Sequence, residues 1–264
     1  MSRITEAFAA ARGAKRAAFV PYLTAGDPDL SRLPDLLRAM TRGGADVIEI
    51  GVPFSDPIAD GVVNQRAAER GRRGGATLRA ILDRCQALRS ESFPPLVLFT
   101  YFNPVHRLGV EAFAAEAAAA RIAGVLVTDL PPEEGADLRR ALEARGIDSI
   151  GLVAPTSSPE RRRAIAEVSR GFLYFISRAG VTGPRDDLPS DLEAQVRATR
   201  EDGRGLPIAV GFGLSRPEQV RAVRGFADGF VVGSALVRLI EAQGSDPGLP
   251  EALERACRAW REAA

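Results

Sequence analysis

The chain has 264 residues, of which 45% are hydrophobic and 26% charged, with 35 basic and 34 acidic side chains. This is the composition of an ordinary globular protein, and it excludes a disordered or collagen-like chain. A net charge of +1 gives no electrostatic reason for a nucleic-acid or membrane-surface partner, and the apolar runs fall short of the roughly 18 residues of a transmembrane helix.

From the N-terminus, residues 1–16 hold no apolar secretory core, which predicts a cytoplasmic protein. Eight strands follow. Several are near-continuous runs of Val, Ile, Leu and Phe, as in parallel strands that are covered on both faces. We place the strands at residues 17–23, 46–51, 96–101, 124–128, 149–153, 172–177, 207–211 and 229–233.

Segments with an apolar period of 3.6 residues lie between the strands and predict helices. One stripe runs through residues 33–40, with Ser31 as its expected N-cap and Pro34 as the third helical residue, where its missing N–H is not needed. A second stripe runs through residues 78–88. Residues 112–123 are rich in alanine and also predict a helix.

The strand–helix unit recurs about eight times, and no Pro/Gly/Ser-rich linker divides the chain at mid-length. We therefore predict a (β/α)₈ TIM barrel, a parallel eight-stranded barrel with outer helices, as a single domain over residues 1–264. An open doubly wound sheet is the alternative. That fold is expected to show a GxGxxG turn after its first strand, where this chain has TAGDP at residues 24–28.

Three rare residue types limit the chemistry. Lys15 is the only lysine and precedes the first predicted strand, which is the wrong end of a barrel for a Schiff base. His106 is the only histidine, too few for a His-rich metal site, and we expect it to be an exposed loop residue. Cys85 and Cys257 are expected to be reduced thiols. Acid–base chemistry must then rest on carboxylates, tyrosines or backbone groups.

The second predicted strand carries a catalytic candidate. Side chains alternate along a strand, so Ile48 and Ile50 face the outer helices while Glu49 points into the barrel. A buried carboxylate is costly unless it is paired or protonated, and apolar surroundings raise its pKa toward that of a general acid and base. The alternative is a structural Glu49 that bonds a backbone amide or an arginine.

The next loop, VPFSDPIADG at residues 52–61, holds a second carboxylate. Its prolines stiffen the backbone, so Asp60 and Glu49 are a candidate proton-transfer pair in one barrel mouth. The alternative is that Asp60 caps the following helix. Tyr101 and Tyr174, in the third and sixth strands, are candidates to bond a substrate or a carboxylate, or else they fill the core.

Two features of the later strands indicate a phosphate-bearing substrate. Gly211 and Gly213 follow the seventh strand and Gly233 follows the eighth, each just before a helix begins. In barrels, backbone N–H groups at these two places hold an anion. The long polar segment 178–190 after the sixth strand is typical of an active-site lid, or alternatively of a disordered surface loop.

Taken together, these strings resemble the tryptophan synthase alpha chain family. The matching segments follow the family's order: residues 21–28 (PYLTAGDP), 49–61 (EIGVPFSDPIADG), 129–131, 177–183 (SRAGVTG), 211–213 and 233–234. The resemblance implies a (β/α)₈ barrel that serves as the alpha subunit. It also implies a carbon–carbon lyase of tryptophan biosynthesis, which cleaves indole-3-glycerol phosphate to indole and glyceraldehyde 3-phosphate.

The resemblance also implies a role for each matching residue. Glu49 matches the catalytic acid and base, Asp60 the carboxylate that handles the indole N–H, and Tyr174 the supporting tyrosine. The implied phosphate contacts are Gly183, Phe212, Gly213, Gly233 and Ser234, and the implied indole pocket is Tyr22, Phe99, Leu126 and Thr182. The family usually has Phe, Leu and Pro where Tyr22, Phe99 and Val62 stand.

The implied retro-aldol reaction uses the indole ring, protonated at C3, as its electron sink, and it requires neither a metal nor a cofactor in this chain. The resemblance further implies a partner, the beta chain that carries pyridoxal phosphate, in an α₂β₂ heterotetramer. We expect the contacts in proline-rich loops at the barrel mouth, residues 53–57, 103–108 and 131–135.

Two other functions remain open at this point. Another phosphate-binding barrel, such as indole-3-glycerol phosphate synthase, is expected to need a catalytic lysine at a strand end. A catalytically idle barrel that only binds and activates a beta chain would not need both Glu49 and Asp60.

Overall fold

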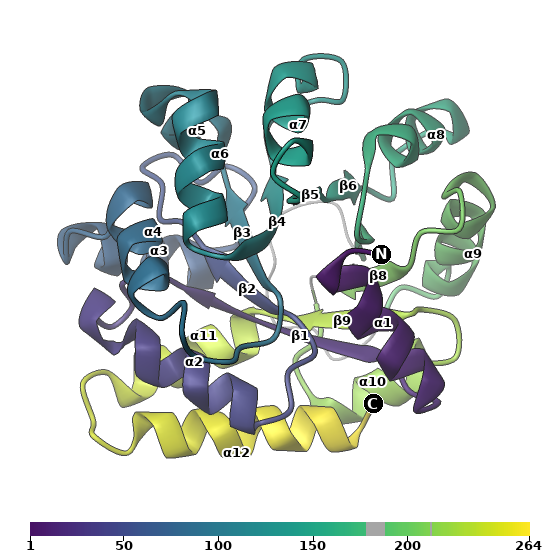
Figure 1. The fold of residues 1–264 in the computed structure, drawn as a ribbon. Coiled ribbons are helices and arrows are strands. Elements are labelled where there is room, and N and C mark those ends of the chain that lie inside the picture. Colours follow the sequence, from purple (N-terminus) through teal and green to yellow (C-terminus); the bar gives the residue numbers. More distant parts are fainter. Residues whose placement is uncertain (178–187, 212) are drawn as a thin grey trace.

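The computed structural model describes residues 1–177, 188–211 and 213–264. In these residues nine parallel strands form one sheet, in the order β5-β4-β3-β2-β1-β9-β8-β7-β6, and helices surround it (Figure 1). The strands are β1 (Ala18–Thr24), β2 (Ile48–Gly51), β3 (Leu96–Thr100), β4 (Ile122–Val127), β5 (Asp148–Ser149), β6 (Gly151–Val153), β7 (Leu173–Ile176), β8 (Ile208–Gly211) and β9 (Gly229–Val232). Residues 178–187 of the expected lid lie outside the described residues.

The expected barrel is confirmed, with its fifth strand broken in two. β5 pairs with β4, while β6, which begins two residues later, pairs with β7. The break is local, because Ile150 between them still donates its N–H to Val125 O at 2.9 Å and Ser149 O accepts from Arg170 N at 2.8 Å. The two short strands, which follow each other in the chain, therefore bring the two ends of the sheet together, and the barrel is nearly closed.

Twelve α-helices lie in the described part of the chain, and most cover the outside of the strands (Figure 1). They are α1 (Arg3–Gly13), α2 (Leu33–Arg42), α3 (Val62–Arg73), α4 (Leu78–Ala87), α5 (Phe102–Leu108), α6 (Val110–Ala119), α7 (Ala136–Glu143), α8 (Pro159–Val168), α9 (Leu192–Asp202), α10 (Val220–Val223), α11 (Ser234–Gln243) and α12 (Leu249–Glu262). His106 is exposed as expected, but it lies on α5 and not in a loop.

Two helix boundaries differ from those expected. Asp29, not Ser31, caps the segment before α2: its carboxylate accepts the Ser31 N–H at 2.7 Å, and a 3-10 turn, Leu30–Arg32, precedes the helix. An aspartate is as good a cap as a serine, so local sequence did not decide between them. The helix expected at residues 112–123 ends at Ala119, because Ile122 and Ala123 already belong to β4.

The core has two layers that follow the alternation of side chains along the strands. Ile48 and Ile50 of β2 pack outward among the helices, as expected, in the larger of two apolar clusters. The smaller cluster fills the barrel interior. Helix α1, which was not expected, supplies Phe8 to that interior, where its ring stacks on Phe172 with centroids 5.2 Å apart. A side chain at Gly229 would overlap the Phe8 ring, so this glycine lets α1 close one end of the barrel.

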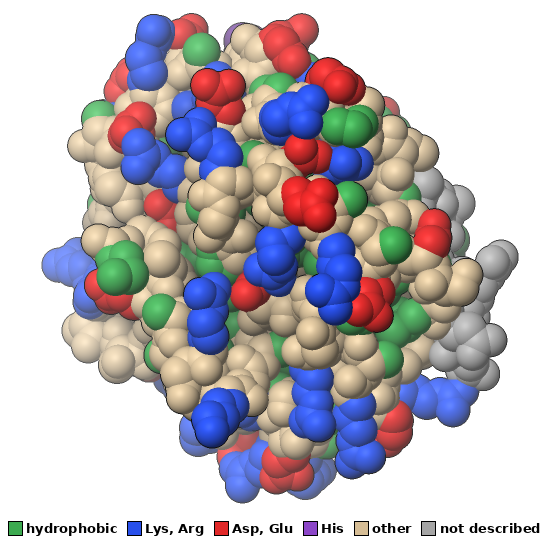
Figure 2. Space-filling view, turned by 90° about the vertical axis from the view of Figure 1, so that its right-hand side faces the viewer, with side chains coloured by type: hydrophobic (Ala, Val, Ile, Leu, Met, Phe, Trp, Pro, Cys, Tyr) green, Lys and Arg blue, Asp and Glu red, His purple; other side chains and the backbone are tan. Residues whose placement is uncertain are grey.

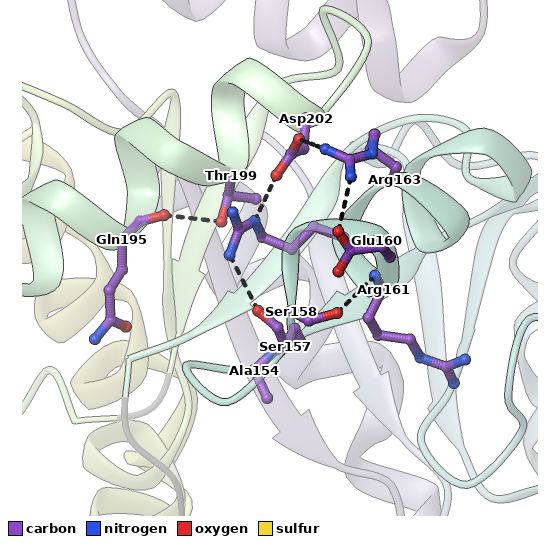
Figure 3. Close-up of polar contacts among 10 residues, drawn as sticks. Ala154, Ser157, Ser158, Glu160, Arg161, Arg163, Gln195, Thr199 and Asp202 are labelled. Atoms are coloured by element: carbon purple, nitrogen blue, oxygen red, sulfur yellow. Dashed lines mark hydrogen bonds and ion pairs between the residues drawn. The ribbon is translucent and has the colours of Figure 1, made fainter.

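Ion pairs join neighbouring helices on the outside. Asp202 at the end of α9 accepts hydrogen bonds from Arg162 and Arg163 of α8, each at 2.8 Å (Figure 3). Arg162 also donates to Ser157 O at 3.0 Å and so fixes the start of α8. Basic and acidic side chains are interspersed over the face shown in Figure 2, in keeping with the near-zero net charge.

Both cysteines are free and buried, as expected for reduced thiols. Cys257 of α12 packs against Gly43, the residue that ends α2. None of the helices in residues 1–177, 188–211 and 213–264 is both long enough and apolar enough to cross a membrane.

Replacing Gly43 by alanine should destabilise the protein by about 1–3 kcal/mol, the usual cost of overpacking a core. An added Cβ would lie 2.4 Å from Cys257 Cβ and 3.0 Å from Glu254 O, so α2 and α12 would have to separate. Gly13→Ala is the matched control, since the space beside Gly13 is open. Denaturant unfolding of both variants gives the comparison. Equal stability of the two variants would contradict the close packing of α2 on α12.

Candidate active site

Glu49 lies inside the barrel, as its place in the strand predicted. In the parallel ladder it stands beside Tyr22 of β1 and Val97 of β3, and its exposed fraction is 0%. Neither carboxyl oxygen has a hydrogen-bond partner within the described residues. Burial therefore raises the pKa of Glu49 to about 8, which leaves the group protonated at neutral pH. The alternative, in which Glu49 pairs with an arginine or a backbone amide, is wrong for the described residues.

Asp60 ends the loop between β2 and α3 and is 7% exposed. The N-cap of α3 is Gly61, so the alternative of Asp60 as a helix cap is wrong. Its carboxylate instead accepts hydrogen bonds from the Tyr101 hydroxyl, at 2.8 Å, and from the Asn64 side chain. Burial raises the pKa of Asp60, while the two donors act in the opposite direction because they stabilise the charged form.

The two carboxyl groups thus stand in different surroundings. Glu49 has an apolar environment without donors, and Asp60 has two donors that favour its ionised form. Such a contrast is the usual basis for one acid and one base in the same site. Tyr101 was a sequence candidate to bond a carboxylate, which the structure confirms. Asn64 was missed, because a polar residue in the first turn of a helix carries no catalytic signal in sequence.

A small cavity of about 30 Å³ brings six of the twelve expected site residues together at the barrel mouth. It is lined by Tyr22, Asn64, Phe99, Tyr174, Gly213, Leu214, Val231, Gly233 and Ser234. Leu126 is fully buried in the same interior cluster as the tyrosines. Thr182, Gly183 and Phe212 lie outside the described residues.

The two tyrosines of the cavity depend on two glycines. A Cβ at Gly51 would lie 2.1 Å from the Tyr22 hydroxyl oxygen, and one at Gly211 would lie 2.2 Å from that of Tyr174. Each hydroxyl therefore occupies space that any other residue at the end of β2 or β8 would fill. Burial raises the pKa of both tyrosines well above its usual value, so both remain neutral hydroxyls. The sequence indicates Gly211 only as part of an anion site, because the tyrosine that fills this space lies 37 positions earlier in the chain.

The opposite side of the cavity offers backbone donors. Gly233 is the N-cap of α11 and no side chain caps that helix, so the first N–H groups of α11 have no partner within the helix. Gly213 has a φ of +114°, which a residue with a side chain rarely adopts. A helix N-terminus next to a glycine turn suits an anionic group such as phosphate.

Larger hollows lie elsewhere on the surface. One of about 390 Å³ lies between α7 and α8, and one of about 520 Å³ lies between residues 52–55 and helices α4 and α5. Glu49 and Asp60 line none of the three cavities, but only the small cavity is lined by Tyr22, the ladder neighbour of Glu49, and by Asn64, which donates to Asp60. We assign the site from the buried carboxyl groups and not from volume, since chemistry needs reactive groups. No cluster of three or more His, Cys, Asp or Glu that could hold a metal occurs in the described part of the chain.

Comparison with known proteins gives one consistent family. A profile described as tryptophan synthase alpha chain matches residues 8–263. The tryptophan synthase alpha chain of Solibacter usitatus is 46% identical over 254 residues, which are 96% of this chain and 95% of that protein. The alpha chain of Synechococcus elongatus is 46% identical over 264 residues, or 100% and 97% of the two chains.

Solved structures agree with this. The tryptophan synthase subunit alpha of Legionella pneumophila superposes with a TM-score of 0.91 at 34% identity, covering 100% of this chain and 98% of that one. A chain in the structure of Mycobacterium tuberculosis tryptophan synthase superposes with a TM-score of 0.88 at 38% identity, covering 99% and 98%.

Replacing Glu49 by glutamine should stabilise the protein at neutral and higher pH. Below about pH 4.5 the carboxyl group is protonated in both the folded and the unfolded chain. As the pH rises toward about 8, only the unfolded chain ionises, and the wild type loses about 1.4 kcal/mol per pH unit, up to about 5 kcal/mol. The glutamine variant does not lose this stability.

Unfolding free energies measured at several pH values between 4.5 and 8 test this. Glu251→Gln, at an exposed position of α12, is the matched control and should follow the wild type. Parallel curves for Glu49→Gln and the wild type would show that Glu49 is not held in its neutral form.

Proposed function

This chain belongs to the tryptophan synthase alpha chain family, and from that premise we propose that it cleaves indole-3-glycerol phosphate to indole and glyceraldehyde 3-phosphate. As an alpha subunit it is a lyase of tryptophan biosynthesis. The observation that carries the specific reaction is the carboxyl group of Glu49, fully buried at the inner wall of the barrel without a hydrogen-bond partner in the described residues. A cytoplasmic location belongs to the same proposal.

In the proposed first step Glu49 acts as a general acid. Its proton is available at neutral pH because burial raises its pKa to about 8. Transfer of that proton to C3 of the indole ring removes the aromaticity of the pyrrole ring and leaves a positive charge at the ring nitrogen. The glyceryl side chain is then attached to C3 of a cationic ring, which can take up the electron pair of the carbon–carbon bond when that bond breaks.

In the second step the ionised Glu49 accepts the proton of the adjacent glyceryl hydroxyl. That oxygen forms the aldehyde carbonyl, the carbon–carbon bond breaks, and its electron pair restores the aromatic indole. Asp60, ionised and held by two donors, stabilises the positive ring nitrogen through its N–H. Tyr174 is proposed to support the pair from β7, since its buried hydroxyl interacts electrostatically with both carboxyl groups.

The proposed binding mode uses the two sides of the cavity. The indole ring would lie among Tyr22, Phe99, Leu126 and Thr182, where Tyr22 and Phe99 pack edge to face with centroids 5.7 Å apart. The phosphate would lie at Gly183, Phe212, Gly213, Gly233 and Ser234, against the N-terminus of α11. Apolar walls for the ring and backbone N–H groups for the anion are the pairing that this substrate needs.

We also propose a beta-chain partner that docks at the barrel mouth, as membership of the family implies. Ile58, next to the loop 53–57, is 76% exposed, and Val62 at the start of α3 is 51% exposed. Exposed apolar side chains beside a site are typical of an interaction surface. Residues 131–135 and α5, the helix that replaces the expected loop 103–108, would complete the surface.

Glu49→Gln should retain the fold and lose about 10²- to 10⁴-fold in indole release, because a general acid and base is removed while shape is kept. The measurement is indole formed from indole-3-glycerol phosphate, with Glu251→Gln as the control for a glutamate-to-glutamine change elsewhere. More than half of the wild-type turnover in Glu49→Gln would overturn the catalytic assignment.

Ile58→Ser should weaken association with the cognate beta chain by about 10- to 100-fold, the worth of burying one large aliphatic side chain. Titration in a sizing or light-scattering experiment measures the affinity. The control is Ala259→Ser, at an exposed position of α12. Unchanged affinity for Ile58→Ser would remove this loop from the proposed interface.

A further inference from the structure

We propose that Tyr101, which the family resemblance did not mark, is the positioning residue for Asp60: its hydroxyl orients the carboxylate at the barrel mouth. The proposal rests on the function proposed above and adds a residue to it. Tyr101 follows β3 and is 2% exposed. It lies between the loop that carries Asp60 and the end of β4.

The hydrogen bonds of the Tyr101 hydroxyl fix the direction of its proton. The hydroxyl oxygen accepts the Ala59 N–H at 3.0 Å and interacts with the Thr128 hydroxyl. A backbone N–H can only donate, so the phenolic proton is left for Asp60 Oδ2 at 2.8 Å. Tyr101 therefore donates to one carboxylate oxygen of Asp60 and, with the same hydroxyl, accepts the backbone N–H of Ala59, the preceding residue.

The ring of Tyr101 is held as firmly as its hydroxyl. It stacks on Phe54, at the other end of the same loop, with ring centroids 4.8 Å apart and an interplanar angle of 26°. Tyr101 therefore contacts the loop at Phe54 and again at Ala59 and Asp60. A loop fastened at both ends holds the Asp60 carboxylate in one place, and positioning of this kind supports catalysis without contact with the substrate.

The titratable groups around Asp60 are neutral, so the hydrogen bond from Tyr101 is a main influence on the charge of the Asp60 carboxyl group. In the described residues, the titratable groups that interact electrostatically with Asp60 are Tyr22, Tyr101 and Tyr174, whose pKa values burial raises. Glu49 interacts with two of these tyrosines, Tyr22 and Tyr174, and is protonated at neutral pH. The Asn64 side chain is the other donor, and its Oδ1 is buried without a partner among the described residues.

Tyr101→Phe keeps the ring and its stack on Phe54 and removes the hydroxyl, which is both the donor to Asp60 and the acceptor of the Ala59 N–H. The pKa of Asp60 should then rise, because the charged form loses a hydrogen bond. The acidic limb of the pH profile of kcat/KM should move up by about one pH unit, and kcat should fall about tenfold or more. In the Asp60→Asn background the same change should cost little further activity, since Tyr101 acts through Asp60.

Thr199→Val is the matched control. Thr199 is fully buried in α9, and its hydroxyl donates to Gln195 O at 2.8 Å, outside the barrel mouth (Figure 3). The Thr199→Val variant loses one buried hydroxyl, as Tyr101→Phe does, and should keep the wild-type pH profile. A Tyr101→Phe variant with lower activity but an unmoved acidic limb, or with the same loss in the Asp60→Asn background, would reduce Tyr101 to a structural residue.

A titration of Asp60 by ¹³C carboxyl NMR separates this proposal from the function itself. The Asp60 signal is identified by its loss in Asp60→Asn, and no substrate is needed. A higher pKa of Asp60 in Tyr101→Phe supports the positioning role even if the wild type releases no indole, a result that would overturn only the proposed reaction. An unchanged pKa of Asp60 beside an active wild type would overturn the positioning role alone.

Discussion

The burial of one uncompensated carboxyl group, Glu49, is the constraint on which the site depends. An ionised carboxylate without donors is strongly disfavoured in such a place, so the fold holds this group as a neutral acid. The nearly closed barrel makes that possible, since the interior position of β2 excludes water. Lower stability at neutral pH is the physical cost of keeping a proton available.

Asp60 is the second carboxyl group of the site, and its surroundings differ from those of Glu49. Because Asp60 lies on a loop, it is reached by donors from α3 and from Tyr101, which follows β3, and these favour its charged form. The barrel wall gives Glu49 no such donors in the described residues. The elements that carry the two carboxyl groups thereby place them in different surroundings, one without donors and one with donors that favour the charged form, which is what a proton donor and a cation-stabilising base require.

Packing around the carboxyl groups is as specific as the groups themselves. Gly51 and Gly211 leave the space that the hydroxyls of Tyr22 and Tyr174 occupy, and a side chain at either glycine would displace a tyrosine. At one end of the barrel, Phe8 of α1 fills the interior. The site therefore rests on a packed core, which lets its side chains keep fixed positions.

The sequence by itself determined the barrel, the parity that turns Glu49 inward, and the placement of glycines after the seventh and eighth strands, because periodicity and strand alternation are local properties. Only the tertiary structure decided that Tyr101 and Asn64 donate to Asp60, that Asp29 caps the turn before α2, and that α1 closes the barrel. The fifth strand is likewise broken where its two halves pair with different neighbours. These features depend on which residues distant in the chain come into contact. The spacing of residues along the sequence does not specify which of several possible partners each residue contacts.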